Sequence, residues 1–157
     1  MNLYDWSETR LVMPSPVGKL LIVQGEGGIT RLTLAGDAAD GTHTPLLKEA
    51  RAQLDAYFSG RLTRFDLPLE ERGTPFEKAV WAALRTVPYG QTRTYGQIAA
   101  QIGKPQAARA VGMANHRNPI AIITPCHRIV GANGALTGYA LGLEMKQVLL
   151  RIEGIRL

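Results

Sequence analysis

The sequence contains one cysteine, Cys126, and only three histidines among its 157 residues. A single cysteine excludes an internal disulfide, and so few thiol and imidazole groups exclude a cysteine-rich zinc site. No apolar run approaches the roughly 18 residues that a membrane helix needs. The segment Met1–Arg10 is polar and carries both signs of charge, so we expect no secretory signal there. These absences predict a cytoplasmic protein without metal, cofactor or membrane contact.

Acidic residues are missing from one long segment. Residues 1–72 hold eight Lys or Arg and ten Asp or Glu, whereas residues 73–157 hold ten basic residues and three acidic ones. From Lys78 to Leu143 there is no acidic residue, although seven basic ones are spread along the segment. Charge of one sign indicates a polyanionic partner, most simply nucleic acid, bound through salt-sensitive phosphate contacts that are largely blind to base sequence. A basic surface without a partner is the alternative.

The charge changes near Arg72 and Gly73, and we expect a domain boundary there, between residues 1–72 and 73–157. In the first part, the pattern predicts a β-hairpin formed by Gly18–Val23 and Ile29–Leu34. It also predicts an amphipathic helix over Pro45–Phe58 and an edge strand over Phe65–Leu69, which contains Pro68. This part contains no cluster of catalytic residue types. Its expected role is support.

The second part opens with a strong helix signal. Thr74-Pro75-Phe76-Glu77 combines an N-cap, a proline at the first helical position and a capping-box glutamate, and the helix is expected to run to Val87, before Pro88. Two short helical patterns follow, separated by a Gly-Lys-Pro turn, and together they predict a helix-turn-helix over Tyr95–Ile102 and Gln106–Asn115. Many ordinary helical hairpins share this pattern.

The second of these helices carries small residues around a single Arg109. A helix that reads bases normally presents long polar side chains, whereas small side chains let a backbone approach DNA closely without reading much sequence. The preference of alanine for helices explains the pattern equally well, and Arg109 then becomes an ordinary surface cation.

Cys126 follows the apolar run Ile120–Ile123, which we expect to be a buried strand, and stands beside His127. A free thiol with a pKa of about 8.5 is only slightly ionised at neutral pH, and an adjacent base raises the thiolate fraction. Neighbouring side chains of an extended segment point to opposite sides, so proton transfer requires a turn after Cys126 or a bridging water. The alternative is an inert, buried cysteine.

Glu153 occupies an unfavourable place in the predicted C-terminal helix, Leu143–Gly154. It falls in the last turn, where the helix dipole disfavours an anion. We therefore expect a specific partner such as His127, whose charged form the carboxylate would stabilise. A frayed surface glutamate is the alternative.

The motif Pro125-Cys126-His127-Arg128-Ile129-Val130, with Asn118-Pro119 before it and Thr137-Gly138-Tyr139 after it, closely resembles the methylated-DNA–protein-cysteine methyltransferases. The resemblance extends in order over residues 74–154. It implies an α/β (α+β) chain with a small ribonuclease-H-like N-terminal domain and a mainly helical C-terminal domain containing a helix-turn-helix. It also implies DNA repair by direct damage reversal: O6-methylguanine, and also O4-methylthymine, is flipped from the duplex and its methyl group is transferred irreversibly, once per molecule.

The resemblance also implies roles for individual residues. Cys126 becomes the methyl acceptor, His127 the base that removes its proton through a water, and Glu153 the group that orients the histidine. Asn118 braces this network, and Tyr95 helps rotate the nucleotide and donates a proton toward the guanine. The residues expected to contact the minor groove are Tyr95, Ala107, Ala108, Arg109, Ala110 and Gly112, with Arg109 filling the gap in the duplex. Those expected to line the base pocket are Asn115, Ile129, Tyr139, Ala140 and Leu141.

Leu141 departs from the family pattern Gly-Tyr-x-Gly-Gly, and Ala140, at the variable position, differs from the members that have serine there. Leu141 replaces a glycine, which favours methyl over bulkier alkyl groups, and Ala140 replaces a serine of some members, which removes one possible hydrogen bond to the base. The expected partner is double-stranded DNA carrying O6-alkylguanine, bound by a chain that is monomeric away from DNA. Three other functions remain open: a non-catalytic protein that binds alkylation damage, a Cys-His-Glu hydrolase, and a helix-turn-helix regulator.

Overall fold

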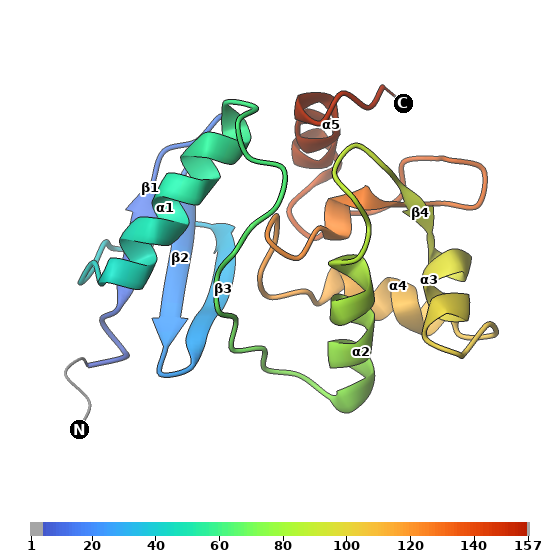
Figure 1. Cartoon of the computed structure of the whole chain (residues 1–157), viewed down its shortest axis with the longest axis horizontal. Helices are drawn as coiled ribbons and strands as arrows, with labels where there is room; N and C mark the ends of the chain where they lie inside the picture. Colours follow the sequence, from blue (N-terminus) through green and yellow to red (C-terminus); the bar gives the residue numbers. More distant parts are fainter. Residues whose placement is uncertain (1–4, 157) are drawn as a thin grey trace. The chain divides into compact units, whose positions relative to one another are not determined.

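The computed structural model describes residues 5–156 and divides into two compact units between Arg72 and Gly73 (Figure 1). The first four residues of the segment Met1–Arg10, where we expected no secretory signal, lie outside the described residues. Within the described part, no helix is both long enough and apolar enough to cross a membrane.

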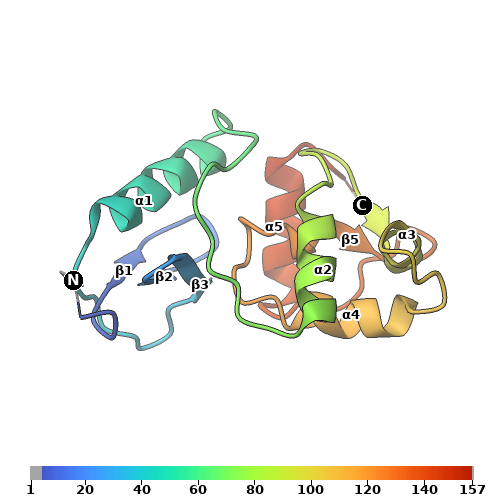
Figure 2. The ribbon, with the colours of Figure 1, turned by 60° about the horizontal axis from the view of Figure 1, so that its bottom comes forward.

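The first unit is an antiparallel sheet with one helix lying across a face of it (Figure 2). The strands pair in the order β1-β2-β3, and the helix α1 follows them; their bounds are Arg10–Met13, Leu20–Gly25, Gly28–Leu34 and Pro45–Phe58. The predicted hairpin and helix are confirmed. Strand β1 was not predicted, because four residues with a central Leu-Val pair give too short a pattern.

The core of this unit forms between the apolar face of the sheet and the apolar face of α1. Alternate strand residues and helix residues three or four apart are buried against one another: Leu11, Met13, Leu20, Ile22, Leu47, Ala50, Leu54 and Tyr57. Thr44 fixes the start of α1, since its hydroxyl accepts a hydrogen bond from the Leu47 amide.

The predicted edge strand Phe65–Leu69 is wrong. Only Leu69 pairs with the sheet, as an isolated parallel bridge to Ile29. The Ile29 amide donates to the carbonyl of Pro68, and the Glu70 amide donates to the carbonyl of Ile29. Pro68 has no N–H to extend the ladder, so the pairing stops after one bridge.

The second unit is mainly helical. Its α-helices are α2 (Pro75–Leu84), α3 (Tyr95–Gln101), α4 (Ala108–His116) and α5 (Leu143–Ile152), and one 3₁₀ turn, η1 (Cys126–Arg128), lies before α5. The two-residue strands β4 (Arg93–Thr94) and β5 (Ile129–Val130) pair in parallel. The two predicted helices of the helix-turn-helix and the C-terminal helix are confirmed, with ends shifted by one or two residues.

Helix α2 begins as the sequence predicts. The Thr74 hydroxyl accepts from the Glu77 amide at 3.1 Å, and the Glu77 carboxylate accepts from the Thr74 amide at 2.9 Å. The Trp81 indole nitrogen donates to the carbonyl of Ala114 at 2.9 Å, which fixes α2 against α4. The helix ends at Leu84, earlier than expected; Val87 is buried, but in the following turn.

The predicted buried strand Ile120–Ile123 is also wrong. The residues are buried, but they form a tight turn in which the Thr124 amide donates to the carbonyl of Ile120. Ile122 takes a left-handed backbone conformation with φ 70°, which a β-branched residue adopts only under constraint. β-Branched residues in an apolar run favour a strand, and here the hydrogen bonds of the turn override that preference.

We predict that Thr74→Ala lowers the free energy of unfolding of the second unit by about 1 kcal/mol, because the Glu77 amide loses its acceptor. Urea denaturation followed by Trp81 fluorescence in a Trp6→Phe background measures this loss. Thr74→Ser retains the hydroxyl and serves as the matched control. Equal stability of the alanine and serine variants would show that the hydroxyl cap of Thr74 contributes nothing.

Candidate active site

The turn before Cys126 is held by the side chain of Asn118. Its amide nitrogen donates to the carbonyl of Thr124 at 2.8 Å, and its amide oxygen accepts from the Ile120 amide at 3.0 Å. One side chain therefore closes both ends of the turn that contains the strained Ile122. The turn delivers Cys126 to the start of η1, so the chain is not extended at the cysteine.

The Cys126 thiol is buried, with 2% of the residue exposed. Burial raises the pKa of the thiol, while hydrogen bonds from the side chains of Asn118 and Tyr139 and the charge of Lys146 act in the opposite direction. The Asn115 side-chain nitrogen lies 3.4 Å from the Cys126 carbonyl oxygen. The sulfur thus lies among polar groups and not in a purely apolar core.

His127 and Glu153 meet in the interior of the unit. The Nε2 atom of His127 lies 2.6 Å from a carboxylate oxygen of Glu153, and both side chains are fully buried. Burial lowers the pKa of His127, and the hydrogen bond and charge of Glu153 only partly oppose that effect. The histidine is therefore neutral at pH 7 and able to accept a proton.

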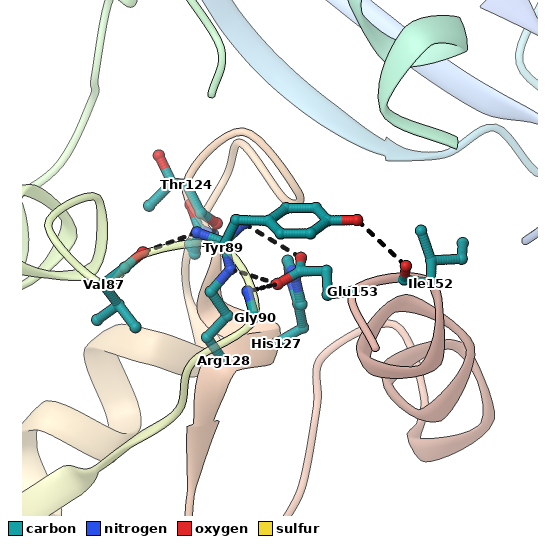
Figure 3. A network of polar contacts seen from close by, with 9 residues as sticks. Val87, Tyr89, Gly90, Thr124, His127, Arg128, Ile152 and Glu153 are labelled. Carbon is teal, nitrogen blue, oxygen red and sulfur yellow. Dashed lines mark hydrogen bonds and ion pairs between the residues drawn. The ribbon is translucent and has the colours of Figure 1, made fainter. Parts of the chain in front are cut away.

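The Glu153 carboxylate also binds the guanidinium of Arg128 (Figure 3). Arg128 donates from Nε to one carboxylate oxygen at 2.8 Å and from Nη2 to the other at 3.1 Å. The Gly90 amide donates to the same carboxylate at 3.1 Å. Glu153 thus has the specific partners that its place at the end of α5 led us to expect.

Arg128 belongs to the motif around Cys126, but the sequence alone indicates no role for it. It is buried, donates to the carbonyl of Val87 at 2.8 Å and lies over the Tyr89 ring. The Tyr89 hydroxyl in turn donates to the carbonyl of Ile152 at 3.1 Å. These contacts fix the segment after α2 to the end of α5, and no local sequence signal could have revealed them.

Tyr95 is half-buried at the first position of α3. Its hydroxyl lies 2.6 Å from the Thr137 hydroxyl, so α3 contacts the segment that leads to Tyr139. A side chain at Gly112 would be in van der Waals contact with the Tyr95 ring, which places α4 beside it. Tyr95 therefore joins the helix pair to the segment around the thiol.

The predicted small-residue face of α4 is only partly open to solvent. Arg109 and Ala110 are exposed, whereas Ala107, Ala108 and Gly112 are half-buried. Met113 is 55% exposed one turn after Arg109, and sequence reasoning missed it. A large exposed apolar side chain on a helix face is a signal that can be recognised only once the orientation of the helix is known.

The residues expected to line a base pocket divide into two groups. Ile129, Tyr139 and Asn115 are buried, and the side-chain oxygen Oδ1 of Asn115 has no hydrogen-bond partner among the described residues. Ala140 is exposed and Leu141 half-buried. No contact places Ala140 or Leu141 at the sulfur. Within residues 5–156, no group of three or more His, Cys, Asp or Glu side chains is arranged to hold a metal ion.

Two family models match the chain and together cover most of it. The DNA-binding domain of 6-O-methylguanine DNA methyltransferase matches residues 75–155, and the ribonuclease-like domain of the same family matches residues 10–70. The methylated-DNA–protein-cysteine methyltransferase of Methanosarcina acetivorans is 49% identical over 150 residues, which are 91% of this chain and 96% of that protein.

Solved structures agree with the family models. The chain is similar to the crystal structure of Mycobacterium tuberculosis OGT in complex with DNA, with a TM-score of 0.84, 50% identity and 92% of each chain covered. It is also similar to the O6-methylguanine-DNA methyltransferase of Pyrococcus kodakaraensis, with a TM-score of 0.59, 26% identity and coverage of 94% of this chain and 99% of that one. The chain belongs to the methylated-DNA–protein-cysteine methyltransferase family, whose members repair O6-methylguanine in DNA.

Proposed function

We propose that Cys126 is the methyl acceptor of this repair reaction: its thiolate attacks the methyl carbon of O6-methylguanine in duplex DNA. The bond between that carbon and O6 breaks, and the departing guanine takes up a proton from Tyr95. The observation that carries the proposal is the burial of the only cysteine, with a buried histidine next to it in the chain and a carboxylate 2.6 Å from that histidine. Nucleophile, base and orienting group are the three parts that activation of a thiol requires.

The proton of the thiol passes to His127. Because Nε2 faces Glu153, the other ring nitrogen, Nδ1, receives the proton through a water. The imidazolium then forms beside the Glu153 carboxylate, which stabilises it. Asn118 holds the turn before Cys126, so the sulfur keeps its place while the proton moves.

The methyl carbon can reach the sulfur only if the base leaves the stack, at a cost of a few kcal/mol that is smaller for a weakened base pair. We assign the DNA contact to the exposed side of α4, where Arg109 fills the gap, and to Tyr95 beside it. The small side chains of α4 suit a close approach to the minor groove without base reading. The roles of binding and chemistry then lie in residues 73–157, with residues 1–72 as support.

The buried thiol sets a further requirement. With 2% of Cys126 exposed, the nucleotide enters only if side chains around the sulfur move aside, among them Tyr139, which is itself buried and acts on the pKa of the thiol. The unpartnered Oδ1 of Asn115 then accepts a hydrogen bond from the amino group of the base. O4-methylthymine presents the same O-methyl carbon and is a second substrate.

The product is a thioether, which neither histidine nor water hydrolyses, so each molecule works once. We expect the wild type to gain a single methyl group when mixed with an excess of duplex oligonucleotide containing O6-methylguanine, and Cys126→Ala to gain none. Intact-mass spectrometry of the protein measures the gain.

The same experiment separates the other functions. A damage-binding protein or a regulator binds the oligonucleotide and keeps its mass, and a hydrolase releases product repeatedly while its mass stays unchanged. A matched duplex with unmodified guanine controls for non-specific addition. Methyl on any residue other than Cys126 would overturn the assignment.

Replacing Glu153 should affect both stability and rate. In Glu153→Gln the buried Arg128 loses its counter-ion, and removal of one partner from such a pair costs about 3–5 kcal/mol in the free energy of unfolding. The methyl-transfer rate falls as well, because the imidazolium loses its stabilising charge. Urea denaturation and single-turnover kinetics measure the two effects. Glu144→Gln, an exposed change at the start of α5, is the control and should leave the rate unchanged and the stability within about 1 kcal/mol.

Leu141 limits the size of the alkyl group in this proposal. It stands where the family pattern has glycine, so a half-buried, branched side chain occupies space, two residues after Tyr139, that glycine would leave free. We expect Leu141→Gly to react faster than the wild type with free benzylguanine and at a similar rate with a methylated oligonucleotide. Rates of Cys126 alkylation measured by mass spectrometry test this. Leu136→Gly, in the same loop but outside the motif, is the control; a faster benzyl reaction in the wild type would refute the prediction.

A further inference from the structure

Lys146 is a buried ammonium group that has only backbone partners. It lies on α5 and has no exposed surface. Its Nζ donates to the carbonyl of Ile129 at 2.5 Å and to that of Thr137 at 3.4 Å. Among residues 5–156 no carboxylate is paired with it. A buried charge without a counter-ion is costly, so this lysine requires an explanation.

The two carbonyls belong to the chain segments that contain Cys126 and Tyr139, and the charge of Lys146 acts on the thiol. Ile129 comes three residues after Cys126, at the end of η1, and Thr137 comes two residues before Tyr139, whose side chain lowers the pKa of the thiol. Lys146 therefore connects the two chain segments that border the sulfur. Burial raises the pKa of Cys126 and lowers that of Lys146, and the attraction between the ammonium and a negative sulfur opposes both shifts.

None of the other charged groups near the sulfur neutralises the positive charge of Lys146. Tyr139, in the loop before α5, and Lys146, on α5, act on the Cys126 thiol, and the other titratable groups near this segment are His127 and Arg128 of η1 and Glu153 at the end of α5. Arg128 and Glu153 form an ion pair, His127 is neutral, and Tyr139 is an uncharged phenol. A neutral thiol leaves the Lys146 ammonium with no opposite charge, whereas a thiolate supplies one.

We propose that Lys146 is the counter-ion of the Cys126 thiolate and so a positioning residue for methyl transfer. The inference rests on the proposed function, in which Cys126 is the methyl acceptor. In the proton step the S–H bond breaks and an N–H bond forms on His127, with no change of oxidation state. The negative charge then lies near Lys146 and the positive charge beside Glu153, so each new charge forms next to an opposite one.

Titration of the thiol in the full chain without DNA tests the proposal. Thiolate is followed by its ultraviolet absorbance, with Cys126→Ser as the blank that removes the tyrosine signal; the single cysteine makes the difference specific. Lys146→Met keeps the length of the side chain and removes its charge. We expect its midpoint to lie about one pH unit or more above that of the wild type, equivalent to about tenfold less thiolate at lower pH.

Lys48→Met is the matched control, since it removes one exposed lysine from α1 and alters net charge equally. Its midpoint should equal that of the wild type. Equal midpoints for Lys146→Met and the wild type would overturn the proposal. A packing defect that leaves the charge unchanged is not expected to raise the titration midpoint of the thiol. Circular dichroism verifies the fold of each variant.

A reciprocal measurement covers the case in which Lys146→Met does not fold. Coupling between two charges acts equally on both, so the Lys146 ammonium should titrate at lower pH in Cys126→Ser than in the wild type. Nuclear magnetic resonance of ¹³C-labelled lysine side chains gives that midpoint, and equal values in the two chains would overturn the proposal. Neither titration uses DNA. A chain that shows the shift but takes no methyl from DNA would disprove the proposed function and leave Lys146 as the counter-ion.

Discussion

The Glu153 carboxylate is the group on which the rest of the site depends. It receives hydrogen bonds from His127, Arg128 and the Gly90 amide, which come from two separate segments of the chain. A buried carboxylate is stable only when hydrogen bonds and opposite charge compensate it. Moving any one of these donors away would leave the carboxylate under-compensated, so the donors are fixed in position. The position of the histidine relative to the nucleophile is thus determined at the far end of α5.

Local signals were sufficient for most helices of the fold. The capping box at Thr74, the proline at the start of α1 and the apolar stripes each depend on residues within a few positions of one another. The unfavourable place of Glu153 at a helix end was itself a local signal, and it indicated a buried partner correctly. The motif around Cys126 added the family and, with it, the expected roles.

Contacts between distant segments could not be predicted in the same way. Even a local contact can escape prediction: Ile120–Ile123 has the composition of a strand, which does not reveal that Asn118 closes a turn there through hydrogen bonds with Ile120 and Thr124. Lys146 looks like a surface residue of an amphipathic helix, because nothing near it in the sequence reveals the carbonyls of Ile129 and Thr137. The two-residue strands β4 and β5 are too short to leave any pattern.

The contact between the Tyr95 and Thr137 hydroxyls has a directional consequence. A phenol carries a single proton, which it gives either to Thr137 or to another acceptor, but not to both. If Tyr95 is to protonate a departing guanine, the threonine must be the donor in this pair, with its own hydrogen directed at the phenol oxygen. The orientation of one hydroxyl rotor thus decides whether the tyrosine arrives at the nucleobase as an acid or only as an apolar ring.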